Sequence, residues 1–398
     1  MQPILSKRSS RVLASPIRKF LPLVRQAEHQ GVEVIKLNVG DPDILPPAAF
    51  LQTVKQYRSK NLGYAPSPGI IEHNQAWVKY YKNFNLHLKP ENIIPTVGCA
   101  EAMLLAMIAA ADPGEEILVF EPLYTSYKGL AASLNIKLVP VTLTLDNNFT
   151  LPRRSEIIKK ISKKTKAILI VNPANPSGKV LTIPELKMIG EIATKYNLLV
   201  LGDETYREIV FDTKPSSLLT MTKIRNRLIV LDSASKRFSL PGARIGCLVS
   251  YNQEIMATLL RLAMIRLSAP TLEQLGLIPL LNNAKGYTRK ITSEYRTRRN
   301  VLTKSLLQIP GVACHKPQGA FYLIARLPVK NSEDFIKFLI TDFRHHNQTV
   351  MLTPAKEFYL TPGHGTNEVR IAYVLNSTKL KRAATIIGEA LKKYQTKP

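Results

Sequence analysis

The feature that most constrains the fold is an alternation of short, β-branched apolar runs with helical patterns through the middle of the chain. The expected strands cover residues 116–120, 138–141, 167–171, 198–201, 228–231 and 246–250. Amphipathic stretches such as residues 183–196 lie between several of them. Strands that alternate with helices form βαβ units, and such units build a mainly parallel sheet. We therefore predict an α/β fold with its ligand crevice at the carboxyl ends of the strands.

The last third of the chain has a different pattern. A long basic helix is expected over residues 287–307, then strands at 320–325 and 368–374, and a closing helix at 379–394. This order predicts a smaller α+β domain, which the first 45 residues are expected to join because chain ends often lie close together. The predicted division is 1–45 (N-terminal arm and part of the small domain), 46–281 (large domain) and 282–398 (small C-terminal domain).

Composition excludes several protein classes. Hydrophobic residues make up 45% of the chain, too many for a disordered protein. No apolar run reaches the roughly 20 residues that a membrane-spanning helix needs. The cysteines Cys99, Cys247 and Cys314 are odd in number and have no metal-ligand spacing, which favours free thiols in a cytoplasmic protein over a disulfide framework or a metal site.

The charge is unusual, because 55 Lys and Arg against 29 Asp and Glu give a net charge of +26. Such a balance can indicate nucleic-acid binding, but the basic residues are scattered and no nucleic-acid-binding motif accompanies them. We therefore expect a solvated basic surface and no nucleic-acid partner. No acidic residue precedes Glu28, as in a transit peptide. We favour a structural arm there and keep organelle targeting as the alternative.

Polar motifs follow several of the expected strands. Ser233-Ala-Ser235-Lys236 comes directly after the strand at 228–231, and Arg244 follows within the same glycine-containing segment. Two hydroxyls and a guanidinium suit a phosphate dianion. A lone lysine at this place would be a surface residue, but one with this company can lie in a crevice beside a phosphate-bearing cofactor.

Three further segments have the same placement. Asp203-Glu-Thr-Tyr206 follows the strand at 198–201, where an aspartate alone would be a helix N-cap. Asn-Pro-Ala-Asn175-Pro-Ser-Gly is a turn by every local rule. Thr-Val-Gly98-Cys99-Ala100 passes from a strand into a helix, whose free backbone N–H groups can bind an anion.

Together and in this order, these motifs resemble those of the class I and II aminotransferases, which are fold-type I pyridoxal-phosphate enzymes. The resemblance runs from about residue 37 to residue 374. It implies a large domain with a mainly parallel seven-stranded sheet between helices, pyridoxal 5'-phosphate as cofactor and a homodimer. Segments 15–19 and 37–43 are similar to a branch described as aspartate aminotransferase-like.

The resemblance also implies a role for each residue. Lys236 forms a Schiff base with the cofactor and then acts as the proton-transferring base. Asp203 pairs with the ring nitrogen, while Asn175 and Tyr206 contact the phenolic oxygen. The ring-stacking and phosphate-binding residues are Tyr124, Gly98, Cys99, Ala100, Ser233, Ser235, Arg244 and, across a dimer interface, Tyr64. The substrate α-carboxylate is expected at Gly40, Asn175 and Arg370.

The amino donor stays open at this point. Glu101 stands where one aspartate-specific subgroup has a lysine for the distal carboxylate. Arg266 lies in the segment from which another subgroup supplies an arginine for this contact across the dimer, so Arg266, or more weakly Arg18, is our candidate. The expected reaction moves an amino group from an L-amino acid, aspartate or another common one, to a 2-oxo acid such as 2-oxoglutarate in a ping-pong sequence. The alternatives are a β-lyase, decarboxylase or oxidase of the same fold, since these share the cofactor, or a nucleic-acid-binding protein suggested by charge alone.

Overall fold

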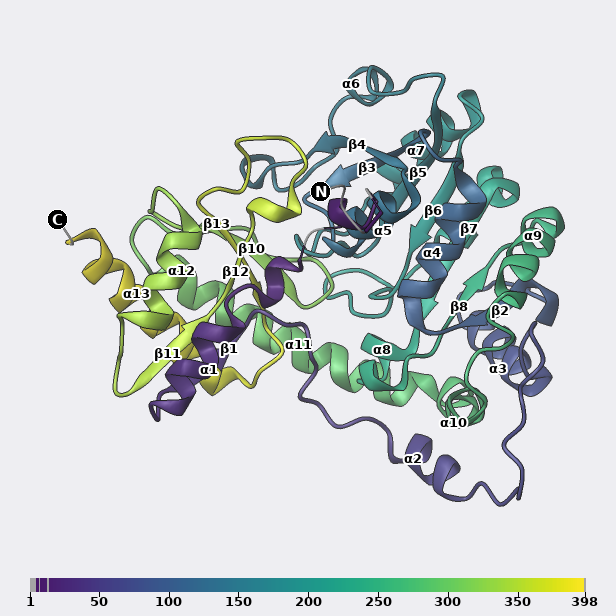
Figure 1. Cartoon of the computed structure of the whole chain (residues 1–398), viewed down its shortest axis with the longest axis horizontal. Coiled ribbons are helices and arrows are strands. Elements are labelled where there is room, and N and C mark those ends of the chain that lie inside the picture. Colours follow the sequence, from purple (N-terminus) through teal and green to yellow (C-terminus); the bar gives the residue numbers. More distant parts are fainter. Residues whose placement is uncertain (1–4, 7, 13, 397–398) are drawn as a thin grey trace.

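The computed structural model describes residues 5–6, 8–12 and 14–396. Residues 1–4, 7 and 13 of the predicted arm and residues 397–398 of the predicted small domain lie outside the described residues. Figure 1 shows a larger part built around a twisted sheet and a smaller part that contains the carboxyl-terminal helix. The helix α11 (Ala284–Leu307) extends between them, packing on α13 (Ser377–Gln395) at one end.

The seven-stranded, mainly parallel sheet is confirmed. Its order is β2-β8-β7-β6-β5-β3-β4, and only β8 runs antiparallel to its neighbours. The strands are β2 (Ile93–Thr96), β3 (Glu116–Glu121), β4 (Lys137–Thr142), β5 (Thr165–Val171), β6 (Leu199–Asp203), β7 (Leu228–Ser233) and β8 (Gly246–Val249). Each expected strand has its counterpart, and β2 adds the edge strand before the helix junction at Gly98.

Helices cover both faces of this sheet, because successive strand residues point to opposite sides. On β5, Ala167 and Leu169 pack with one buried cluster, while Ile168 and Ile170 pack with the other. The helices of the large part are α2 (Ala48–Lys55), α3 (Ile71–Lys82), α4 (Gly98–Ala110), α5 (Ser126–Leu134), α6 (Arg154–Ile158), α7 (Ile183–Lys195), α8 (Ala234–Arg237), α9 (Gln253–Met264) and α10 (Thr271–Asn282).

Local sequence accounts for where these helices begin. At the start of α7, the Thr182 side chain accepts from the Glu185 backbone N–H at 3.3 Å, and the Thr182 N–H donates to Glu185 Oε2 at 2.7 Å. Such a reciprocal pair satisfies two N–H groups that the first helical turn leaves free. The sequence pattern places this helix correctly, to within a residue at its end.

The smaller part combines both ends of the described chain. Strand β1 (Glu33–Lys36) pairs in parallel with β11 (Gln348–Met351), and α1 (Leu21–His29) packs on α12 (Ser332–Thr341). An antiparallel sheet of order β12-β13-β10-β9 completes this part: β9 (Ala313–Cys314), β10 (Tyr322–Arg326), β12 (Thr353–Pro354) and β13 (Glu368–Ala372). The predicted division into domains at residues 45 and 281 stays a proposal.

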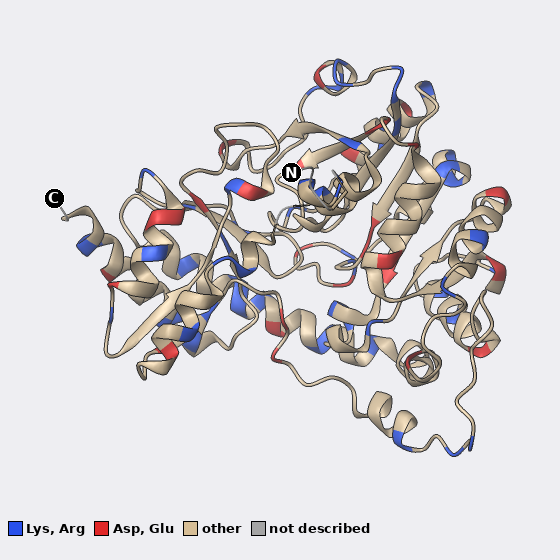
Figure 2. Ribbon diagram, in the orientation of Figure 1, with Lys and Arg blue, Asp and Glu red and all other residues tan. Residues whose placement is uncertain are grey.

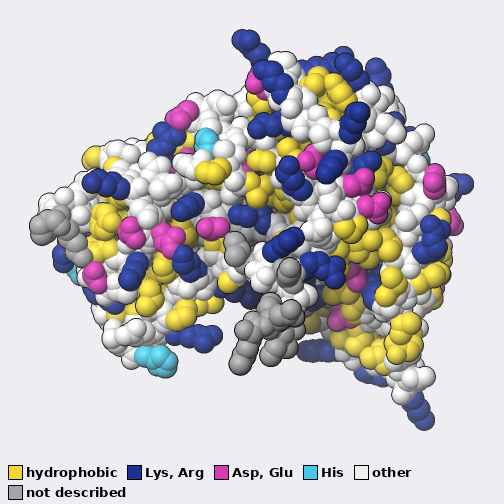
Figure 3. All heavy atoms as spheres, turned by 45° about the horizontal axis from the view of Figure 1, so that its top comes forward, with side chains coloured by type: hydrophobic (Ala, Val, Ile, Leu, Met, Phe, Trp, Pro, Cys, Tyr) yellow, Lys and Arg dark blue, Asp and Glu magenta, His cyan; other side chains and the backbone are white. Residues whose placement is uncertain are grey.

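The basic residues are spread over both parts of the molecule. Figure 2 shows Lys and Arg on helices and loops throughout the ribbon, and Figure 3 shows them interspersed with acidic and apolar side chains on one face. Within the described ranges, no helix is long and apolar enough to cross a membrane. Those same ranges contain no group of three or more His, Cys, Asp or Glu side chains placed to bind a metal.

Candidate functional site

A cavity of about 190 Å³ lies at the carboxyl ends of β5, β6 and β7, which is where parallel sheets bind ligands. Its walls come mainly from the large part, with Tyr322 contributed by β10. The predicted residues found in its lining are Cys99, Ala100, Tyr124, Asn175, Asp203, Tyr206, Ser233, Ser235, Lys236 and Arg244. The structure therefore brings together side chains that the sequence separates by up to about 145 residues.

Lys236 presents a free amine to this cavity from the short helix α8. Its Nζ donates to the Gly40 carbonyl oxygen at 2.7 Å and lies 5.7 Å from the centre of the Phe321 ring. Burial lowers the pKa of Lys236 to about 8, with a smaller contribution from the positive charges of Arg244 and Arg370 and an opposing one from Asp41. An amine with a lowered pKa is a nucleophile and a base near neutral pH.

One end of the cavity is suited to an anion. Helix α4 begins there with Gly98, and the hydroxyls of Ser233 and Ser235 lie beside each other at 2.9 Å. Arg244 approaches from the loop after α8, and a Cβ added to Gly98 would lie 2.7 Å from its Nη2. Gly98 also has a φ of +69°, which favours glycine. A helix amino terminus, two hydroxyls and a guanidinium together form a site for a phosphate dianion.

A buried carboxylate faces the cavity from the end of β6. Asp203 accepts hydrogen bonds from Tyr127 Oη at 2.6 Å, from the Cys99 thiol at 3.3 Å and from the Thr205 backbone N–H at 2.9 Å. All three donors are neutral, and no ion pair within the described ranges includes Asp203. Because buried carboxylates ordinarily pair with a cation, this one fits a protonated ring nitrogen.

Arg370 on β13 is the opposite case, a buried cation that has no anionic partner among the described residues. Its side chain is 1% exposed, and it donates to Asn175 Oδ1 at 3.2 Å and to the Asn38 carbonyl oxygen at 2.5 Å. The Arg370 Nε has no hydrogen-bond partner, and no carboxylate pairs with this guanidinium among the described residues. Burial lowers the pKa of Arg370. A buried guanidinium with an unused donor is suited to a substrate carboxylate.

Tyr322 connects these groups, and the sequence analysis missed it. Tyr206 Oη donates to Tyr322 Oη at 3.1 Å, and the Arg370 guanidinium lies over the Tyr322 ring at 4.5 Å. A Cβ on Gly40 would lie 1.7 Å from the Tyr322 hydroxyl, so only glycine fits beneath it. The sequence signal is an apolar strand start, Gly-Ala-Phe-Tyr, in which nothing distinguishes a site tyrosine from a core one.

Tyr127 is a second residue that was missed. It lies three residues after Tyr124, and the two rings meet edge to face at 5.5 Å. Tyr124 and Tyr127 are the ends of the turn that leads into α5, in which the Tyr127 backbone N–H donates to the Tyr124 carbonyl oxygen at 3.1 Å. A second tyrosine so close to Tyr124 could have indicated a second cavity residue. Burial raises the pKa of the Tyr127 hydroxyl, with Asp203 adding to the effect, so it remains a donor.

Three predicted residues lie away from this cavity. Tyr64 is 83% exposed, and Arg18 is exposed at the end of a short 3₁₀ helix (Pro16–Arg18). Arg266 forms an ion pair with Glu101 at 3.0 Å and donates to the Pro95 carbonyl oxygen at 2.6 Å. Its Nη1 is buried without a partner. The proposed contacts of Tyr64 and Arg266 require a second subunit, so one chain cannot display them.

Comparison with known proteins is consistent with this geometry. The family model described as aminotransferase class I and II matches residues 32–387. The aspartate aminotransferase of Pyrococcus horikoshii is 30% identical over 96% of this chain and 97% of its own. The aromatic-amino-acid aminotransferase 2 of Thermococcus litoralis is 30% identical over 98% of each chain. Among solved structures, the alanine aminotransferase of Pyrococcus furiosus has a TM-score of 0.89 at 29% identity, covering 98% of this chain and 100% of its own.

Proposed function

Because this chain belongs to the class I and II aminotransferase family, we propose that it moves the amino group of an L-amino acid to a 2-oxo acid, using pyridoxal 5'-phosphate bound at the Lys236 cavity. Members of this family use that cofactor. One observation supports the proposal most strongly. An amine of lowered pKa and a carboxylate without a cation line one cavity beside a phosphate-type anion site, and a guanidinium without an anion contacts Asn175 and Tyr322 in its wall.

The cavity offers a partner for each part of the cofactor. The phosphate would bind at the start of α4 (Gly98, Cys99, Ala100) and at Ser233, Ser235 and Arg244. Asp203 would hold the protonated ring nitrogen, Asn175 and Tyr206 the phenolic oxygen, and Tyr124 the ring face. Lys236 would carry the cofactor through its amine. Each of these residues except Gly98 lines the cavity, and Gly98 begins the helix that closes its anion end.

When bound, pyridoxal 5'-phosphate supplies an electron sink that makes the substrate Cα–H bond acidic. The chain supplies the positioning and the proton transfer. Arg370 and Asn175 bind the α-carboxylate and so hold the Cα–H bond in one orientation. Lys236 Nζ accepts the Cα proton, and a pKa near 8 leaves a useful fraction of it unprotonated at neutral pH. Asp203 is fixed by its three donors, so its carboxylate needs no rearrangement.

The structure also supports a homodimer as part of this proposal. Large apolar side chains are exposed in two stretches of the chain, at Leu45, Leu62, Tyr64 and Ile71 and at Met264, Ile265 and Leu267. Exposed apolar groups of this kind often mark an interface between proteins. In the proposed dimer, Tyr64 of each protomer reaches the phosphate site of the other. Sedimentation equilibrium tests this, and a monomer at micromolar concentration would contradict it.

The amino donor is the least constrained part of the proposal, because the similar proteins are named as aspartate, aromatic-amino-acid and alanine aminotransferases. We propose an acidic donor, with Arg266 as its distal-carboxylate contact and Arg18 as the weaker candidate. For Arg266 to do this, its pair with Glu101 must open or be shared in the dimer. Arg266→Ala should then raise KM for aspartate or glutamate far more than for an aromatic amino acid. Equal losses on every substrate would remove this assignment.

A panel of amino acids tests the reaction itself. The cofactor-loaded protein is mixed with each amino acid, with and without 2-oxoglutarate, while the visible absorbance and the released oxo acid are followed. Transfer predicts one equivalent of oxo acid without acceptor and turnover with it. Sustained turnover without acceptor would favour a β-lyase, decarboxylase or oxidase. A protein that binds no chromophore would overturn the proposal.

Cytoplasmic location stays a prediction.

A further inference from the structure

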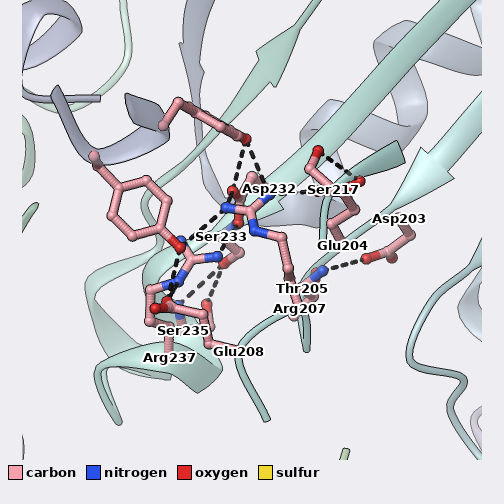
Figure 4. Close-up of polar contacts among 12 residues, drawn as sticks. Asp203, Glu204, Thr205, Arg207, Glu208, Ser217, Asp232, Ser233, Ser235 and Arg237 are labelled. Carbon is pink, nitrogen blue, oxygen red and sulfur yellow. Dashed lines mark hydrogen bonds and ion pairs between the residues drawn. The ribbon is translucent and has the colours of Figure 1, made fainter. Parts of the chain in front are cut away.

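Directly behind the cavity lies a cluster of buried charges that the proposed mechanism does not use (Figure 4). At its centre is Asp232, which is 0% exposed. Its carboxylate accepts from Arg207 Nη2 at 2.5 Å, Arg237 Nη2 at 2.8 Å, Tyr81 Oη at 2.7 Å and the Ser233 backbone N–H at 2.7 Å. Four donors on one buried carboxylate fix its position and that of the groups that bind it.

The two arginines extend this contact in opposite directions. Arg207 also pairs with Glu204 at the end of β6, and Arg237 also pairs with Glu208. Glu204 and Glu208 have neutral donors as well, since Ser217 Oγ donates to Glu204 at 3.0 Å and Tyr80 Oη donates to Glu208 at 2.7 Å. The cluster therefore ties the end of β6 to the end of β7 through paired charges, and helix α3 joins it through the hydroxyls of Tyr80 and Tyr81.

The order of residues along the chain gives this cluster its significance. Asp203, Tyr206, Ser233 and Lys236 line the cavity. Their immediate neighbours in sequence all belong to the charge cluster: Glu204, Arg207, Asp232 and Arg237. At each of these four places, one residue faces the cavity and the next is held on the other side. In Figure 4, Ser233 and Ser235 lie against the cluster, while Asp203 lies to one side of it and accepts from the Thr205 backbone N–H.

Charge is balanced to within one unit in this cluster. Two guanidinium groups face three carboxylates, and burial alone would raise the pKa of Asp232, but Arg207 and Arg237 lower it. Replacing buried ion pairs by apolar residues is often neutral for stability, so stability alone does not explain four buried charges beside the partly buried Glu208. A requirement for one fixed geometry does.

We propose that Arg207 and Arg237, through the Asp232 carboxylate that they share, are positioning residues that hold Lys236 and Asp203 at a fixed separation across the cavity. This inference rests on the proposed function, because the separation matters only if both residues contact one cofactor. Arg237 is the more direct of the two, since it adjoins Lys236 within the single short helix α8.

The test compares three full-length variants as cofactor-loaded proteins: Arg237→Met, Arg237→Lys and Arg299→Met. Arg299 is a matched control, because it is buried to the same extent and pairs with Asp212 at 2.7 Å, outside the cavity. Two properties are measured for each: the midpoint of thermal unfolding, and the rate of cofactor release together with the visible circular dichroism band, which reports the orientation of the bound ring.

Both methionine variants are expected to lower the unfolding midpoint. Arg237→Met leaves the Glu208 carboxylate without its guanidinium, and Arg299→Met leaves the buried Pro317 carbonyl oxygen without its donor. Only Arg237→Met should also accelerate cofactor release, by about tenfold, and diminish the dichroism band, because a shift of the anchoring groups of less than 1 Å is enough for such an effect. Arg237→Lys should release the cofactor at an intermediate rate, since an ammonium keeps the positive charge but lacks the planar group of donors with which the guanidinium contacts both Asp232 and Glu208.

The inference is contradicted if Arg237→Met loses stability while its release rate and dichroism band match those of the unaltered protein. If Arg237→Met does not fold, Arg237→Lys decides in the same way. Failure of the proposed function would give a different result, because the unaltered protein would then have no visible circular dichroism band from a bound cofactor.

Discussion

Two sets of buried charges lie on opposite sides of the same strand ends, and they differ in one respect. On the cavity side, Lys236, Asp203 and Arg370 have no ion pair among the described residues. On the other side, Asp232 and its two arginines form ion pairs with one another. Since an unpaired buried charge costs free energy in the folded state, the contrast separates groups kept for a ligand from groups kept for geometry. Replacing a residue of the first set should therefore reduce activity with little loss of stability, whereas replacing one of the second set should reduce stability first.

The largest effect is expected for Lys236→Ala. Loss of the proton-transferring amine should reduce kcat by about 10⁴-fold, and the Schiff-base absorbance should disappear. The free energy of unfolding should stay the same or rise, because the removed amine has a pKa lowered by burial. Paired assays of oxo-acid release and urea unfolding check both effects. A large loss of stability would place Lys236 with the structural charges instead.

Arg207→Met should act mainly on stability. Glu204 and Asp232 would each lose a buried partner, which costs about 3–5 kcal/mol of unfolding free energy. Urea denaturation measures this loss. The double variant Arg207→Met with Glu204→Met is the control and should recover part of it, since both partners of one pair are then apolar. If Arg207→Met is as stable as the unaltered protein, the paired set has no structural role.

Arg370→Lys should lower kcat/KM for L-amino acids by about 100-fold, because hydrogen bonds to charged groups contribute about 1.5–3 kcal/mol and lysine cannot bind a carboxylate with two parallel donors. Unfolding free energy should change little. Primary amines without an α-carboxylate are the control substrates, and their low rates should be unaffected. A uniform loss on both substrate types would mean that Arg370 has another task.

The smallest effect is expected for Tyr322→Phe. This change removes only the hydroxyl that accepts from Tyr206. The lost hydrogen bond contributes about 1 kcal/mol, so kcat/KM should fall roughly fivefold. Tyr295→Phe is the matched control, because the Tyr295 hydroxyl is buried without a hydrogen-bond partner and its loss should be neutral. Steady-state assays of both variants give the comparison. Equal effects would show that the Tyr322 hydroxyl does not support the site.

The sequence predicts the unpaired set far better than the paired one. Lys236, Asp203 and Arg370 lie in motifs whose order along the chain is distinctive, and the sheet follows from apolar strands such as β7, which is buried on both faces. The ion pairs of Asp232 cannot be read from the sequence in this way. Arg207 lies 25 residues before it and Tyr81 lies 151 residues before it, so only the folded chain shows that they meet.

The substrate side of the site stays open for a related physical reason. Arg266 is bound to Glu101 and Tyr64 extends into solvent, so their proposed roles depend on the surface of a second protomer. Local patterns report on contacts within a segment, and the motifs report on the cofactor. Neither the local patterns nor the motifs specify which substrate side chain would contact the second protomer.

The most direct test of the unpaired set is the reactivity of Lys236 in the cofactor-free protein. Pyridoxal 5'-phosphate is added at a series of pH values, the product is reduced with borohydride, and the labelled peptide is identified by mass spectrometry. Only the unprotonated amine reacts, and burial, assisted by Arg244 and Arg370 and opposed by Asp41, lowers the pKa of Lys236 to about 8. Labelling should therefore fall on Lys236, with a rate that rises with pH and levels off above about pH 8. Labelling spread over surface lysines, with a midpoint near the ordinary lysine pKa of about 10.4, would contradict the account.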